Sequence, residues 1–167
     1  MSVTLRYRGT LNDLSRLTEL QNEFQDIAAA QAWPCDLLER GVSEQDRGRV
    51  LAPPLALRGV KLTVHPQTDP LWFTFDEQGV LTRLGSFSLG LPSAPGVAGS
   101  QRFGFLHQSQ ASIQTSIGGS ELHLTVVGLL DYLKRVYVQD LTVSDDTGYW
   151  DSRDKGALCA LMDAPRR

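Results

Sequence analysis

Cysteine is scarce in this sequence, which has Cys35 and Cys159 as its only two among 167 residues. The two form no CxxC or other pair at the spacing of metal ligands, so the pattern indicates free thiols in a reducing compartment. A single disulfide between them is the alternative that the sequence leaves open. A fold held together by several disulfides is excluded.

Long hydrophobic runs are absent as well, and the longest apolar stretches are too short to cross a bilayer. Residues 1 to 13, MSVTLRYRGTLND, alternate apolar and polar positions and carry two arginines, unlike the continuous apolar core of a secretion signal. We therefore expect a soluble cytoplasmic protein with no membrane partner.

Neither sign of charge dominates the chain. The formal net charge is −3, and residues 1 to 84 hold 11 acidic and 9 basic residues, against 8 and 7 in residues 101 to 167. Neither half is basic enough to bind a phosphate backbone, so we expect no nucleic-acid partner. Arginine outnumbers lysine 13 to 3, which we interpret as the coding bias of a GC-rich genome and as an indication of a bacterial-type protein.

The apolar content is that of one ordinary globular domain, because 41% of the residues are hydrophobic and 21% are charged. Residues 3 to 8 alternate apolar and polar positions, which predicts a strand with one buried face. Thr10 is expected to cap a helix that runs to about Ala32, and Pro34 is expected to end it.

The same order of elements returns in the second half of the chain. Residues 111 to 117 alternate, and the apolar spacing after the capping Ser120 predicts a helix to Tyr137. Residues 103 to 107 predict a further short strand, and residues 154 to 162 predict a short terminal helix.

Two segments have similar sequences: LTVHPQTDPLW, which ends at Trp72, and LTVSDDTGYW, which ends at Trp150. We therefore predict an α+β fold of one domain, residues 1 to 167, with pseudo-repeat halves 1 to 84 and 101 to 167. It would be a two-layer sandwich in which an antiparallel or mixed sheet is covered on one face by two long helices. The arrangement would be ferredoxin-like, with internal pseudo-duplication of a strand, helix, strand, strand unit.

Two long segments break the repeat. Residues 85 to 100 hold ten Gly, Pro or Ser in sixteen, which predicts a flexible linker or loop between the halves. Residues 33 to 58 form an insertion with a short helix predicted at residues 36 to 40.

One candidate ligand site lies at the turn of residues 116 to 120. Gly118, Gly119 and Ser120 stand between a predicted strand and a helix start, where free backbone amides and the helix dipole can hold an anion. The same glycines would also serve a sharp turn, and neither a phosphate-loop lysine nor a GxGxxG spacing is present. Arg6 and Arg8 complete this candidate set of ligand-binding residues.

A second candidate surface lies in residues 143 to 156, where four aspartates flank an aromatic pair. The spacing fits no calcium loop, and the simplest interpretation is a turn in which aspartates bond nearby backbone amides. The alternative is a partner surface, because acids around exposed rings resemble interface hot spots. Its residues would be Asp145, Asp146, Tyr149 and Asp151.

We expect no catalytic, metal-binding or cofactor-binding set, because no nucleophile, base and orienting group stand in a recognisable pattern. The favoured hypothesis is a non-enzymatic module that binds a protein or a small ligand, with a homodimer formed through a sheet edge as one version of it. The alternative is an enzyme or sensor that binds a phosphorylated small molecule at residues 116 to 120. The polar face of the predicted sheet is the expected docking surface, with Thr4, Arg6, Arg8, Ser112, Gln114 and Ser116.

Overall fold

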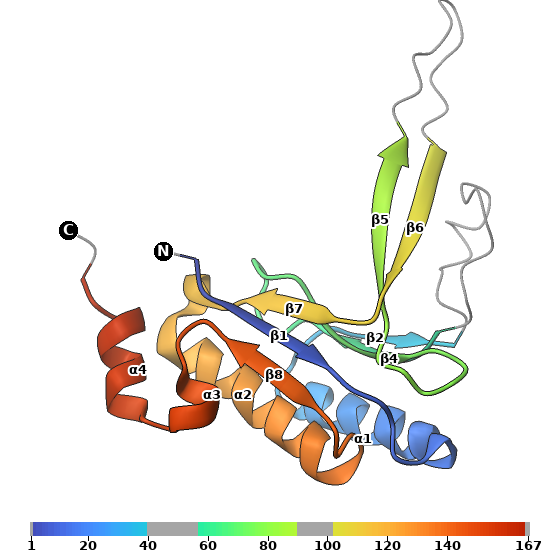
Figure 1. Ribbon diagram of the computed structural model, residues 1–167, viewed down its shortest axis with the longest axis horizontal. Coiled ribbons are helices and arrows are strands. Elements are labelled where there is room, and N and C mark those ends of the chain that lie inside the picture. The colour runs from blue at the N-terminus through green and yellow to red at the C-terminus, as the bar shows by residue number, and fades with distance from the viewer. Residues whose placement is uncertain (1, 40–56, 90–101, 166–167) are drawn as a thin grey trace, which may run out of the picture.

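The structure is a computed structural model that describes residues 2–39, 57–89 and 102–165 (Figure 1). It is a mixed α+β protein, as the sequence predicts. The strands are β1 (Thr4–Arg8), β2 (Cys35–Leu38), β3 (Arg58–Leu62), β4 (Leu71–Phe75), β5 (Arg83–Leu89), β6 (Arg102–Gln108), β7 (Ala111–Gln114) and β8 (Thr142–Asp145). The α-helices are α1 (Leu17–Ala30), α2 (Gly119–Val136), α3 (Tyr149–Ser152) and α4 (Lys155–Met162).

The first sheet has the order β7-β1-β8, and both of its strand pairs are antiparallel. In β1 the apolar side chains Leu5 and Tyr7 are buried in the core, whereas Arg8 is exposed and Arg6 is half-buried. The predicted alternation is confirmed for residues 5 to 8, because a strand points successive side chains to opposite faces. It is wrong for Thr4, which is buried although it is expected on the polar face.

The second sheet has the order β2-β3-β4 and is also antiparallel. The helix predicted at residues 36 to 40 is wrong for the residues that the structure describes, since Cys35–Leu38 form the edge strand β2. Four residues are too few to fix a helix by their own periodicity, and pairing with Arg58–Leu62 decides their conformation instead. The rest of the predicted insertion, residues 40–56, lies outside the described residues.

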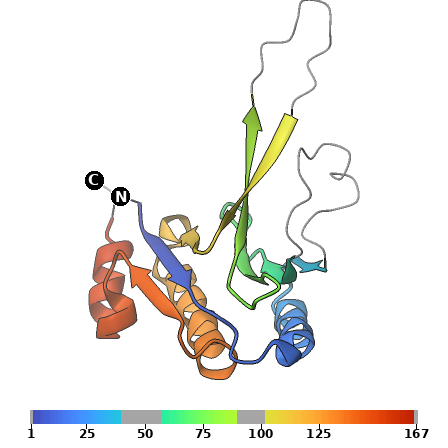
Figure 2. The same ribbon diagram turned by 45° about the vertical axis from the view of Figure 1, so that its right-hand side comes forward.

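The third sheet is the hairpin of β5 and β6, which stands away from the body of the molecule (Figures 1 and 2). The strand predicted at residues 103 to 107 is confirmed as part of β6. The prediction of a linker over residues 85 to 100 is wrong for residues 85 to 89, because they pair with β6 in register. The remaining residues of that segment are outside the described part of the chain.

The long helices form where the periodicity predicts them, but their starts differ. Asp13, not Thr10, caps the first helical turn, and its carboxylate accepts the Ser15 amide at 2.9 Å. The Thr10 amide donates to the Asp140 side chain at 2.8 Å, so Thr10 serves a link between distant segments. Ser120 lies inside α2 and does not cap it.

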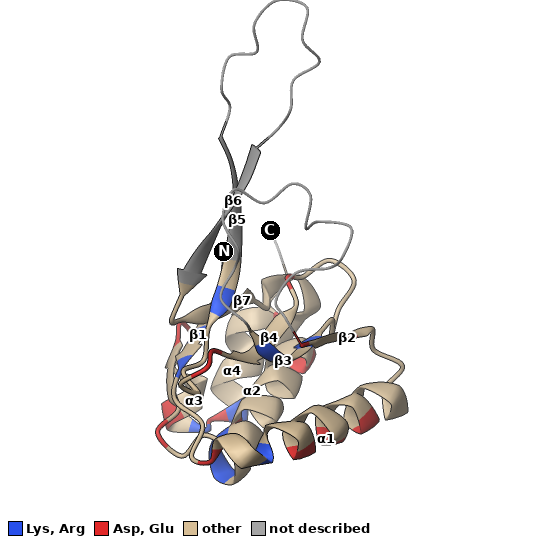
Figure 3. Ribbon diagram, turned by 90° about the vertical axis from the view of Figure 1, so that its right-hand side faces the viewer, with Lys and Arg blue, Asp and Glu red and all other residues tan. Residues whose placement is uncertain are grey.

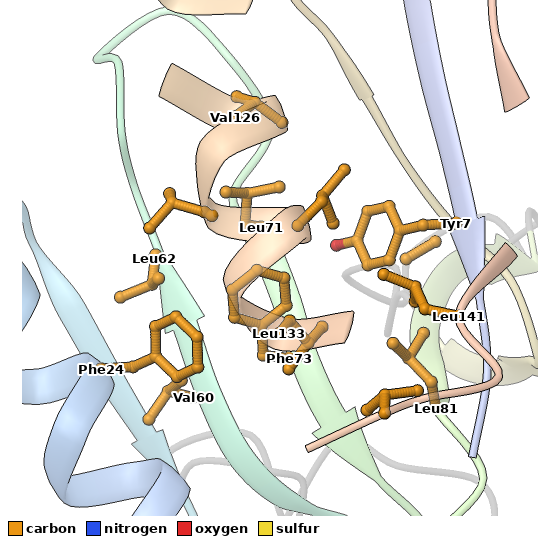
Figure 4. Packing of buried hydrophobic residues seen from close by; sticks show 14 of the residues in the cluster. Tyr7, Phe24, Val60, Leu62, Leu71, Phe73, Leu81, Val126, Leu133 and Leu141 are labelled. Atoms are coloured by element: carbon orange, nitrogen blue, oxygen red, sulfur yellow. The ribbon is translucent and has the colours of Figure 1, made fainter. Parts of the chain in front are cut away.

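One hydrophobic core joins both long helices to the two three-stranded sheets (Figure 4). Phe24 of α1 packs against Phe73 of β4 with ring centroids 4.9 Å apart, and Leu133 of α2 lies in the same cluster. Figure 2 shows α1 and α2 on the same side of the strands. Burial of these side chains from water is the main stabilising contribution.

The hydroxyl of Tyr7 connects the two sheets. It donates to the Trp72 carbonyl at 3.0 Å and accepts from the Trp72 amide at 2.9 Å. Burial raises the pKa of Tyr7 well above its ordinary value, so the hydroxyl stays protonated. Tyr7 thus gives the main chain of β4 the partners that a neighbouring strand would otherwise supply.

The two tryptophans at the ends of the similar segments lie in different kinds of element. Trp72 lies in strand β4 beneath the Lys61 ammonium, which is 4.4 Å from its ring centroid. Trp150 lies in helix α3, with the Arg153 guanidinium at 4.7 Å. Both rings pack against the core, but the segments that carry them fold differently because Gly148 and the Asp145 carboxylate start a helical turn only before Trp150.

Candidate functional site

The face of the β7-β1-β8 sheet opposite the core carries polar side chains. Arg6 of β1 lies in register with Ser112 on one neighbouring strand and Ser144 on the other, and Arg8 lies in register with Thr142. Figure 3 shows basic residues on β1 and acidic residues along α1. Of the residues expected on this face, Gln114 and Arg8 are exposed and Thr4 is buried.

Asp146 closes one end of this face. Its carboxylate accepts the Thr4 amide at 3.0 Å and forms an ion pair with Arg6 at 3.0 Å. The two charged side chains are 42% and 39% exposed, so water screens the pair and its contribution to stability is at most about 1 kcal/mol. The contact orients Arg6 more than it stabilises the fold.

A hollow of about 540 Å³ lies where the β5–β6 hairpin meets this face. Among the described residues that line it, Arg6 is the one with a charge, and most of the other lining groups are amides and hydroxyls. Such a lining can donate to and accept from polar groups of a ligand, with the guanidinium available to a carboxylate or phosphate. The lining residues are Arg6, Gln108, Ser109, Gln110, Ala111 and Ser112.

The turn before α2, predicted as an anion site, already holds a carboxylate of the chain itself. Asp163, which follows α4, accepts the Ser120 amide at 2.9 Å and the Ser120 hydroxyl. These hydrogen bonds hold the pKa of Asp163 below its ordinary value. Asp163 therefore satisfies an amide at the helix start, where an external anion would otherwise bind.

Neither of two hollows formed by the described residues is lined by all five predicted ligand-binding residues. Arg6 lines the hollow at the root of the hairpin. A second hollow, of about 610 Å³, is lined by Ser116 and Ile117 together with residues 66–69 and Gln114. Gly118, Gly119 and Ser120 line neither of these two hollows.

A buried hydrogen-bonded network that the sequence did not reveal joins β7, α2 and β8. The Nδ1 atom of His123 lies 2.8 Å from the Thr115 hydroxyl, and its Nε2 atom lies 3.0 Å from the Asp145 carboxylate. Thr115 and His123 are 0% exposed, and the Asp145 side chain is 1% exposed. The three groups have the order of a catalytic triad, but their burial closes the hydroxyl to any substrate.

Asp145 also accepts hydrogen bonds from the start of α3. The Thr147 amide donates at 2.8 Å, the Thr147 hydroxyl at 2.7 Å and the Trp150 amide at 3.0 Å. Burial raises the pKa of Asp145, but the hydrogen bonds from Thr147 and His123 outweigh it, so the pKa lies below its ordinary value. Asp145 is thus an ionised acceptor shared by three elements of the fold.

The other residues predicted as a partner surface have separate positions. Asp146 pairs with Arg6, and Tyr149 packs edge-on against the His123 ring with centroids 6.2 Å apart. Asp151 is exposed. The side chain of Asp145 is not at the surface, so the turn interpretation of Asp145 describes its contacts better than the surface interpretation does.

Both cysteines of the chain lie among the described residues. Cys35 and Cys159 are both free, and burial raises the pKa of the Cys35 thiol, which disfavours a reactive thiolate. The described part of the chain holds no group of three or more His, Cys, Asp or Glu residues placed to bind a metal.

Comparison with protein-family models, curated proteins and solved structures finds no match to this chain. Across residues 2–39, 57–89 and 102–165, none of the helices has the length and apolar character needed to cross a membrane.

Proposed function

We propose that this protein is a non-enzymatic, cytoplasmic interaction module that docks a protein or small ligand on the exposed face of the β7-β1-β8 sheet. The observation that supports the proposal is the polar hollow beside this face, which borders Arg6 at the root of the projecting hairpin. In the described residues Arg8 has no ion-pair partner. A docking partner would therefore present hydrogen-bonding groups and a carboxylate or phosphate toward the two arginines.

The proposal is tested by reversing the charge of Arg8, which is exposed. We expect Arg8→Glu to fold normally and to weaken retention of the cellular partner by about tenfold or more, because it replaces attraction by repulsion at the docking surface. The measurement is capture on the immobilised protein, followed by titration of the purified partner.

The matched control is Arg135→Glu, which reverses an exposed arginine on α2. It changes the net charge of the chain by the same amount and should leave retention unchanged. Equal loss with both variants would mean that net charge and not the sheet face governs binding, and the proposal would be wrong.

The rival function is an enzyme or sensor that binds a phosphorylated small molecule at residues 116 to 120. It is favoured by the eighteen-residue helix α2 that starts there, because a helix start attracts anions. It is disfavoured by Asp163, which would have to leave before an anion could reach the Ser120 amide.

A thermal-shift screen separates the two functions. We expect inorganic phosphate, nucleotides and sugar phosphates at about 10 mM to leave the melting temperature of the wild-type chain unchanged. We expect Asp163→Ala to melt at a lower temperature, and phosphate to recover part of that loss, because the freed Ser120 amide can then donate to an external anion.

The control for this screen is Asp151→Ala, which removes an exposed carboxylate away from the turn and should gain no response to phosphate. Stabilisation of the wild-type chain by any phosphorylated compound would instead favour the rival function.

A ferredoxin-like sandwich produced by duplication stays a proposal for the origin of the fold. The order strand then helix in β1 and α1, and again in β7 and α2, supports it. The antiparallel pairing of β1 with β7 and the different structures around the two tryptophans count against it.

A further inference from the structure

The hairpin of β5 and β6 differs from the other sheet edges of this protein. The edge strands β2, β7 and β8 are four residues long and the edge strand β4 is five, whereas β5 and β6 are seven residues each. Short edge strands offer few unpaired backbone groups to another chain. The hairpin, with two strands and no third strand beside either within the described residues, offers two long edges.

The composition of the hairpin lacks the usual protection of such edges. Residues 84–89 and 103–108 contain no Lys, Arg, Asp, Glu or Pro, and six of these twelve residues are Phe or Leu. Natural proteins block exposed strand edges with charged residues and prolines. Each strand has one charged residue, Arg83 in β5 and Arg102 in β6, and it is the first residue of the strand. A two-stranded hairpin alone in water is marginally stable, so a long hairpin that stands away from the body and has no charge along the rest of its strands points to an additional strand beside it.

We propose that the additional strand comes from a second copy of this chain, through antiparallel pairing of the two hairpins into one four-stranded sheet. The inference goes beyond the proposed function, because it concerns the hairpin and not the β7-β1-β8 face. A twofold axis brings the same edge of each copy together, so an edge of seven residues meets an edge of equal length.

The charges of the hairpin fit this pairing. The two strands contain two charged residues, Arg83 and Arg102, and no acidic residue, so the hairpin offers little to a partner that binds through several ion pairs. In an antiparallel pairing centred on β5, Ser86 of one copy lies opposite Ser86 of the other, and Arg83 lies opposite Leu89. The two Arg83 residues are then roughly 20 Å apart along the strands, which is beyond the screening length of about 8 Å in physiological salt.

Ser86 is the position for a test, because it lies at the middle of β5 and in register with Phe105 at the middle of β6. At about 100 µM, we expect light scattering to give the wild-type chain twice its 18.4 kDa mass. Ser86→Lys and Ser86→Glu should each be monomeric, since like charges meet near the axis. An equal mixture of the two variants should form dimers, because the charges are then opposite.

The control variants are Asn22→Lys and Asn22→Glu, which add the same charges at an exposed position on α1 and should stay dimeric. Hydrogen exchange of the wild-type chain gives a second readout that needs no variant. Amides of residues 84–89 and 103–108 should be better protected at about 100 µM than at about 1 µM, because dimers follow mass action.

Three results would overturn the inference. They are a monomeric wild-type chain at the higher concentration, Ser86 variants that dimerise as well as the wild type, and monomers that bind neutral phosphatidylcholine vesicles through the hairpin. The Arg8→Glu capture experiment does not depend on the hairpin. If the wild-type chain is monomeric and Arg8→Glu still weakens capture of the partner, the dimer is refuted and the docking function is kept.

Discussion

Replacing Asp145 with alanine is expected to lower the free energy of unfolding by about 3 to 5 kcal/mol, the cost of breaking a buried ionic hydrogen-bond network. The substitution leaves His123 Nε2 and the amides of Thr147 and Trp150 without their acceptor. Each unsatisfied buried donor costs roughly 1 to 3 kcal/mol. Urea denaturation followed by circular dichroism measures the loss.

The matched control is Asp151→Ala, six residues further along and exposed, which should change stability by no more than about 0.5 kcal/mol. The loss of unfolding free energy in Asp145→Asn should lie between those of the two alanine variants, since the side-chain amide keeps one acceptor oxygen but loses the charge. If Asp145→Ala cost no more than the control, the network around His123 would not be holding β7, α2 and β8 together.

The same carboxylate makes stability depend on pH. The pKa of Asp145 in the folded chain lies below its ordinary value of 3.8, so the ionised form stabilises the fold at neutral pH. That contribution is present above the unfolded pKa and is lost as the pH falls through the lowered folded value. The midpoint in urea should therefore fall more steeply below about pH 4 in the wild type than in Asp145→Asn.

Replacing Gly59 with alanine is expected to be at least as damaging, with a loss of about 3 kcal/mol or more. A Cβ atom at this position would lie 2.0 Å from the Phe73 carbonyl oxygen, and the residue has a φ of +148°. Both problems lie in the backbone of the β3–β4 pair, so neither can be relieved by a side-chain rotation. Thermal unfolding and the loss of strand signal in circular dichroism measure the effect.

Gly128→Ala provides the control, because no atom lies within 4 Å of the added Cβ and the residue sits inside α2. Alanine in a helix interior should raise stability by about 0.5 to 1 kcal/mol. If both variants changed stability by the same amount, the tight approach of β3 to β4 at Gly59 would not constrain the fold.

Elements with a strong local period could be predicted from the sequence. The alternation in β1 and the apolar stripe of α2 depend only on which side chains face the core, and Leu5, Leu122 and Leu133 are buried as expected. The terminal helix α4 was also predictable, since Asp154 caps it through the Ala157 amide at 3.0 Å, and a cap is a local signal.

The errors fall where a distant segment decides the conformation. Residues 85 to 89 have the composition of a linker, yet pairing with β6 makes them a strand. Thr10 has the residue type of a helix cap, but Asp140 takes its amide. Asp145 and Asp146 are neighbours of one type, and only the positions of His123 and Arg6 make the first a buried acceptor and the second a surface ion pair.

The sequence by itself determined the α+β class, the two long helices and the alternating face of the first strand, because hydrophobic periodicity is a property of consecutive residues. The tertiary structure alone decided which polar groups are buried, which carboxylate occupies the start of α2 and which strands are left with open edges. These depend on contacts between different elements of the fold, such as the hydrogen bonds of Ser120 with Asp163, 43 positions apart, and of Thr4 with Asp146, 142 positions apart. The periodicity of consecutive residues contains no information on such pairs.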